Sequence, residues 1–153
     1  MSARPAVRLA LGVLVVSGLF VGVWAAVAPR SFFLDFPGLG HTWTAADGPY
    51  NEHLVRDVGE LNLALSMLTA CAVAWMTRPL VVAASVAWLV YSLPHFAYHA
   101  FNLGAVNGTG DQVAELASLS TPILLAGLVL AAVARRDIAA APTRARRWPG
   151  GAS

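Results

Sequence analysis

Residues 58–101 decide the fold of this chain, because they hold two long apolar runs separated by a very short connection. VGELNLALSMLTACAVAWMT (58–77) is followed, after Arg78 and Pro79, by LVVAASVAWLVYSLPHFAYHAF (80–101). Each run is close to the length of about 20 residues that an α-helix needs to cross roughly 30 Å of hydrocarbon. The short connection allows only an antiparallel pair of helices.

Two further apolar runs cover residues 7–28 and 112–134. The composition agrees with them, since 58% of the residues are hydrophobic and only 12% are charged, about half the charged share of a soluble domain. The sequence therefore predicts an all-α integral membrane protein with a single domain over residues 1–153. We expect four transmembrane helices in an up-down-up-down bundle, with an aromatic outer loop between the first and the second.

The first run has two interpretations. Arg4 and Arg8 precede it, and Ala26–Ala28 resembles the small-residue site of a cleaved signal peptide. The apolar stretch is longer than the 7–15 residues typical of a signal peptide, and Pro29 directly follows the candidate cleavage site. We therefore expect a retained transmembrane helix.

The basic residues are distributed unevenly between the two sides of the predicted bundle. All ten are Arg, and only Arg30 and Arg56 fall in the predicted outer regions. Because positively charged loops stay in the cytoplasm, we expect a multi-pass plasma-membrane protein with both termini cytoplasmic. The other eight lie at the termini or in the short turn: Arg4, Arg8, Arg78, Arg135, Arg136, Arg144, Arg146 and Arg147.

Residues 135–153 form a predicted basic cytoplasmic tail. Its Arg side chains would be attracted to anionic lipids of the inner leaflet by about 1 kcal/mol each. The tail is short and carries no recognisable nucleic-acid-binding fold, so we expect the lipid bilayer as its partner and no nucleic acid. Another membrane protein or a second copy of the chain is a further candidate partner.

Polar side chains gather near the predicted outer end of the bundle. His53, Asp57 and Glu60 share one helix face by their i, i+4, i+7 spacing, and His95 and His99 share another. The two His residues are the candidate metal ligands, because two His at i, i+4 can bind one ion. The full candidate polar cluster comprises His53, Arg56, Asp57, Glu60, Asn62, Asn102 and Glu115.

Three roles are open for these residues. In the first, they only fasten the helices together, with Arg56 paired to Glu60 or Glu115, since charge near a helix end costs little in a membrane. In the second, His95 and His99 bind a metal ion or haem, and a carboxylate from the second predicted helix completes the site. In the third, they bind a quinone-like or other lipophilic ligand, or transfer protons. No cofactor follows from the residue pattern alone, and no catalytic set is apparent.

The stretches SFFLDFPG (31–38), PYNEHLVRDVG (49–59) and PHFAYH (94–99) resemble a group of small actinobacterial membrane proteins of unknown function. The four-helix layout is loosely similar to that of the DoxX-like membrane proteins. This resemblance implies a link to quinone-linked oxidoreductases, of which some DoxX-like proteins are subunits. Neither resemblance carries a catalytic residue across. We expect a non-enzymatic accessory or interaction subunit, and the alternative is a redox protein with a metal, haem or quinone site at its extracytoplasmic mouth.

Overall fold

The computed structural model describes residues 4–106 and 108–140, and these residues are largely helical. Four long helices are α1 (Arg4–Val27), α3 (Glu52–Trp75), α4 (Arg78–Phe101) and α5 (Thr109–Ala140). Each is long and apolar enough to cross a membrane. The prediction of a helical chain with four candidate membrane spans is therefore confirmed. Residues 141–153 of the predicted basic tail lie outside the described part.

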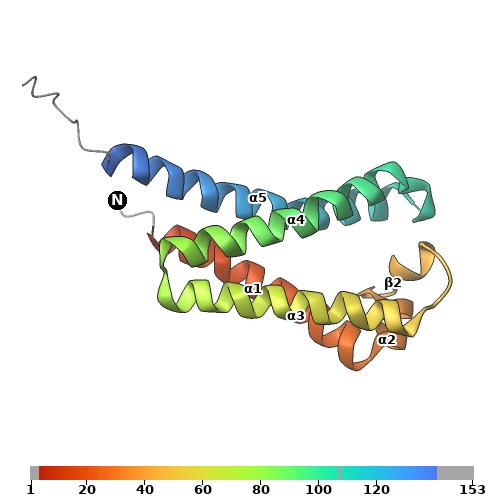
Figure 1. Ribbon diagram of the computed structural model, residues 1–153. Coiled ribbons are helices and arrows are strands. Elements are labelled where there is room, and N and C mark those ends of the chain that lie inside the picture. Colours follow the sequence, from red (N-terminus) through yellow and green to blue (C-terminus); the bar gives the residue numbers. More distant parts are fainter. Residues whose placement is uncertain (1–3, 107, 141–153) are drawn as a thin grey trace, which may run out of the picture.

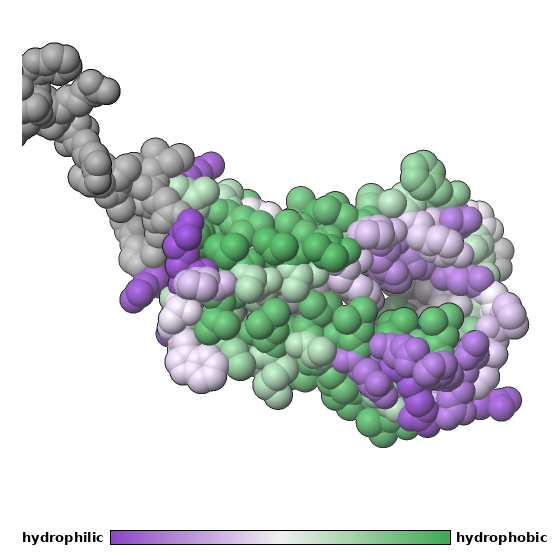
Figure 2. All heavy atoms as spheres, in the orientation of Figure 1, coloured by the Kyte–Doolittle hydropathy of each residue, from purple (hydrophilic) through white to green (hydrophobic). Residues whose placement is uncertain are grey.

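The four long helices lie alongside one another (Figure 1). The start of α1, the connection between α3 and α4, and the end of α5 lie at one end of the molecule, which we name the turn end. The segments 28–51 and 102–106 lie at the opposite end, which we name the loop end. Hydrophilic residues are prominent at both ends, and hydrophobic residues cover most of the length between them (Figure 2).

The loop end is built from short elements. The helix α2 (Pro29–Asp35) follows α1 almost directly, and the two-residue strands β1 (Pro37–Gly38) and β2 (His41–Thr42) pair antiparallel. A 3-10 turn, η1 (Thr44–Ala46), then leads towards α3, and a second one, η2 (Leu103–Ala105), connects α4 to α5. Aromatic rings of the segment after α1 pack together, with Phe32 and Phe36 at 4.6 Å between centroids.

The helix α3 begins at Glu52, six residues before the predicted apolar span, and ends at Trp75 rather than at residue 77. Asn51 starts it, because its side chain accepts a hydrogen bond from the backbone N–H of Leu54 at 3.2 Å. Met76 ends it in the left-handed conformation, at φ 49°. The charged stretch before residue 58 is thus the first part of the helix itself.

α1 and α3 approach each other very closely at glycines. A Cβ atom placed on Gly59 would lie 2.5 Å from the backbone nitrogen of Ala26, and one on Gly22 would lie 3.0 Å from the carbonyl oxygen of Gly59. Helices in membranes pack tightly where small residues let their backbones meet. The inward face of α3 therefore follows Gly59 and includes Val55, Asn62 and Ser66, all of which are buried.

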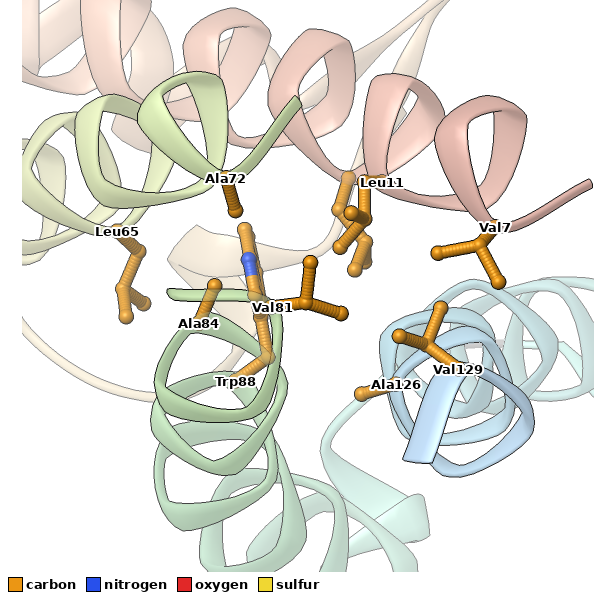
Figure 3. Close-up of a cluster of buried hydrophobic side chains, with 10 residues drawn as sticks. Val7, Leu11, Leu65, Ala72, Val81, Ala84, Trp88, Ala126 and Val129 are labelled. Carbon is orange, nitrogen blue, oxygen red and sulfur yellow. The ribbon is translucent and has the colours of Figure 1, made fainter. Parts of the chain in front are cut away.

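The apolar core joins all four long helices around Trp88 (Figure 3). Leu11 of α1, Ala72 of α3 and Val129 of α5 belong to the same buried cluster. The indole N–H of Trp88 donates a hydrogen bond to Thr69 Oγ1 at 2.9 Å. This bond holds α4 in one position along the axis of α3. It therefore also positions the polar residues that follow Trp88 on α4.

Candidate functional site

His99, Glu115 and Asp47 come together at the loop end. His99 Nδ1 lies 2.9 Å from Glu115 Oε1 and 3.8 Å from Asp47 Oδ2. One nitrogen or oxygen of each residue lies within 4.8 Å of the corresponding atoms of the other two. We name these residues the loop-end triad. The side chains of His99 and Glu115 are only 12% and 4% exposed, so two of the three donors are largely screened from solvent.

Each member of the triad is held by a different element. His99 lies in the last turn of α4, where its carbonyl accepts a hydrogen bond from Asn102 N–H at 3.1 Å. Glu115 lies in the second turn of α5, and Asp47 follows η1, where its N–H bonds to Thr44 at 3.3 Å. The triad thus forms only where the loop before α3 meets the end of α4 and the start of α5.

From the triad towards the middle of the molecule, aromatic and polar side chains lie in a row along one face of α4. The His95 and His99 rings meet edge to face at 4.8 Å between centroids, and His95 stacks on Tyr91 at 5.4 Å. The Tyr91 hydroxyl accepts a hydrogen bond from Asn62 Nδ2 at 3.2 Å. A continuous row of contacts therefore extends from the triad to the middle of α3. Neither nitrogen of His95 makes a hydrogen bond to another described residue.

The structure divides the predicted polar cluster into separate groups. His53 and Asp57 contact each other at 3.4 Å, but their side chains are 88% and 52% exposed, and Glu60 is exposed as well. This face points away from His95 and His99, because Gly59 fixes the opposite side of α3 against α1. Asn62, which shares the inward face of Gly59, is the only predicted α3 residue that contacts the row on α4 among the described side chains.

The first of the three open roles paired Arg56 with Glu60 or Glu115, and neither pair is present among the described contacts. Arg56 Nη2 lies 2.9 Å from Glu52 Oε1, one helical turn earlier, and Arg56 Nη1 donates to the carbonyl of Ala26 at the end of α1. The reason is geometric. The first turns of α3 pack against the end of α1, so the Arg56 side chain contacts α1. Asn102 is exposed, and its side chain donates a hydrogen bond to the carbonyl of Tyr98 at 2.7 Å and to no other described residue.

Asp47, His41 and Asp111 were not among the residues predicted to form a site. His41 Nδ1 lies 2.9 Å from Asp111 Oδ1, which ties β2 to the start of α5. Two His–carboxylate contacts, this one and that between His99 and Asp47, therefore connect the loop before α3 to the α4–α5 pair. These ionisable residues were visible in the sequence, but their partners were not, because Asp47 and His41 lie in a segment without a fixed periodicity.

Three buried polar atoms lack a hydrogen-bond partner among the described residues. They are Trp43 Nε1 in the loop, Ser66 Oγ on α3 and Ser92 Oγ on α4. Ser66 Oγ faces Gly18 of α1, where a Cβ atom would leave it no room. Tyr50 lies in the loop before α3, outside the membrane-spanning helices. Partial desolvation, and after it the neighbouring Glu52 carboxylate, raise the pKa of the Tyr50 phenol, which stays uncharged at neutral pH.

The chemistry of the triad suits a divalent metal ion. One imidazole and two carboxylates are ligands that zinc and other first-row ions accept, and catalytic zinc sites often have three protein ligands. Asp47 is exposed, but the buried carboxylate of Glu115 needs a compensating positive charge if it is ionised, and a bound cation would supply one. The same arrangement therefore serves either as an ion-pair fastener or as a metal site.

Comparison with known proteins adds no further constraint. No family model matches the chain, and neither the curated proteins nor the solved structures contain a significant match.

Proposed function

We propose that this chain is a multi-pass membrane protein that binds a divalent metal ion through Asp47, His99 and Glu115 at its extracytoplasmic end. The observation that carries the proposal is the convergence of these three donors within 4.8 Å of one another. The three donors come from three different segments, and an ion placed among them could contact all three. The metal alternative is favoured over haem or quinone because the donors are small, close together and mostly carboxylates.

The placement relative to the membrane rests on the arginines. Arg4, Arg78 and Arg135 belong to the turn end, where the start of α1, the α3–α4 connection and the late part of α5 meet (Figure 1). Positively charged segments are retained in the cytoplasm, which favours a cytoplasmic turn end and an extracytoplasmic loop end. The proposed up-down-up-down order in the plasma membrane follows from this. A reporter enzyme that works only in the cytoplasm should therefore be active when it is fused after Ser153.

An equilibrium titration tests metal binding. Full-length protein in detergent, freed of metal by a chelator, is titrated with Zn²⁺ against a chromophoric chelator of known affinity. We expect one ion per chain. His99→Ala and Glu115→Gln each remove a donor and should weaken binding by about 100-fold or more, since even residues behind the direct ligands are worth 10–100-fold.

His53→Ala is the matched control. His53 also lies beside a carboxylate, Asp57, at the loop end, but it is exposed and belongs to no triad. Its removal should leave the affinity unchanged. If the wild-type protein binds no stoichiometric ion, or if His53→Ala weakens binding as much as His99→Ala, the proposal is wrong.

The second candidate is the non-enzymatic accessory subunit expected from the sequence. Its support is that the His41–Asp111 and His99–Glu115 contacts already connect the loop and the helices without any ion. In that case the partner is another membrane protein or a second copy. Mild-detergent purification should then return a complex of fixed stoichiometry, and a metal-free monomer without a partner would contradict both candidates. The resemblance to DoxX-like proteins stays a prediction.

A further inference from the structure

His95 holds metal-binding atoms that nothing else in the described structure uses. Its imidazole lies one helical turn below His99 on the same face of α4, and the two rings are 4.8 Å apart. Its remaining ring contact is the stack on Tyr91, with the planes inclined by only 16°. A stack engages the ring face, so both nitrogens remain without a hydrogen bond to the described residues.

The spacing of the two histidines suits chelation. Residues four apart on a helix lie side by side, and two His in this relation bind a single zinc ion in metal-binding helices. We propose that His95 is the fourth protein ligand of the loop-end triad, and that the complete site takes a transition-metal ion of the zinc class. The inference rests on the proposed function, because it adds a ligand to the same site.

In the described arrangement His95 is not among the donors that lie within 4.8 Å of one another, so its side chain has to turn to reach the ion. His95 needs to turn its ring from Tyr91 towards His99, and α4 itself can stay in place because adjacent helical turns already put the two rings in contact. Tyr91 keeps its hydroxyl bonded to Asn62 Nδ2. The interaction given up is a ring contact without a hydrogen bond, and the interaction gained is a metal–nitrogen bond.

The fourth ligand decides which ions are accepted. Two imidazoles and two carboxylates form a mixed nitrogen and oxygen set, which suits Zn²⁺, Co²⁺ and related ions. Mg²⁺ and Ca²⁺ prefer oxygen ligands and higher coordination numbers, so two imidazoles select against them. Four protein ligands also close the site, as in structural zinc centres. The bound ion would therefore hold Asp47, and with it the loop before α3, against α4 and α5.

Cobalt provides a direct readout of the ligand set. Full-length protein in detergent is loaded with Co²⁺, and its visible absorption is compared with that of His95→Ala. We expect the intense bands of a four-coordinate ion in the wild type, and weak bands of a more highly coordinated ion in the variant. Zinc affinity of His95→Ala should fall by about 10–100-fold or more. Tyr91→Phe keeps the ring that His95 stacks on, so its metal affinity should be unchanged.

The outcomes separate this inference from the proposed function. If His99→Ala abolishes binding while His95→Ala keeps both the affinity and the cobalt spectrum, His95 is no ligand and the triad alone binds the ion. If neither variant changes binding, the proposed site itself is wrong. Displacement of Zn²⁺ by a thousandfold excess of Mg²⁺ would also overturn the assigned ligand set. If His95→Ala does not fold, X-ray absorption of the zinc-loaded wild type decides, because one imidazole instead of two would refute the inference.

Discussion

Replacing Gly59 by Ala should destabilise the bundle, although Ala is the better helix former. The new Cβ would lie 2.5 Å from the backbone nitrogen of Ala26, whereas ordinary contact begins at 3.4 Å. The difference, 3.4 − 2.5 = 0.9 Å, has to be met by moving α1 and α3 apart, because backbone atoms cannot turn aside. A gap of 0.5–1 Å removes about a quarter to a half of the dispersion energy of each affected contact.

The expected size follows from two opposing terms. Overpacking of this kind costs about 1–3 kcal/mol, and the higher helix propensity of Ala returns up to about 1 kcal/mol. We therefore expect a net loss of about 1–2 kcal/mol in the free energy of unfolding. Gly12→Ala is the matched control, because no atom lies within 4 Å of a Cβ placed at Gly12. It should be neutral or stabilising by up to about 1 kcal/mol.

The assay is reversible unfolding of the purified protein in mixed detergent micelles, followed by circular dichroism. Gly59→Ala should unfold at a lower denaturant concentration than the wild type, and Gly12→Ala at the same or a higher one. If both variants are stabilised equally, α1 and α3 do not meet at Gly59 and the described packing is wrong.

Three further predictions concern individual contacts. Trp88→Phe removes the hydrogen bond to Thr69 and should cost about 1 kcal/mol of unfolding free energy in the same assay; an unchanged midpoint would contradict the bond. Asn62→Leu leaves the partly buried Tyr91 hydroxyl without its donor and should cost about 1–3 kcal/mol, and the double variant with Tyr91→Phe should recover part of that loss. His41→Ala removes the contact between β2 and Asp111 of α5, so limited proteolysis should cleave residues 36–51 faster than in the wild type. Equal cleavage rates would show that the His41 contact does not hold this segment.

The four helices could be predicted from the sequence because apolar length alone identifies a candidate membrane span. The spacing of His53 and Asp57 indicated helix before residue 58, but the predicted span left this part out, since the apolar run begins at residue 58 while Asn51 caps the helix seven residues earlier. A cap is a local signal of one side chain, and it is easily outweighed by hydropathy when a span is drawn.

The candidate site could be predicted only in part. Helical periodicity put His95 and His99 on one face, and it also put His53 and Asp57 together. It could not determine which face of α3 turns inward, because that depends on Gly59 meeting Ala25 and Ala26 of α1. Asp47 was missed for a related reason: its loop is far from His99 in the sequence, and only the folded connections bring the two together.

The most direct test of the central claim is the anomalous diffraction of zinc-soaked crystals of the full chain, recorded on both sides of the zinc absorption edge. We predict one anomalous peak per chain between Asp47, His99 and Glu115, about 2.0–2.2 Å from a His99 nitrogen and from the two carboxylates. The His53–Asp57 pair in the same crystal serves as an internal control and should carry no peak. A fully soaked crystal with no peak at the loop-end triad, or with its main peak on His53, would contradict the metal site.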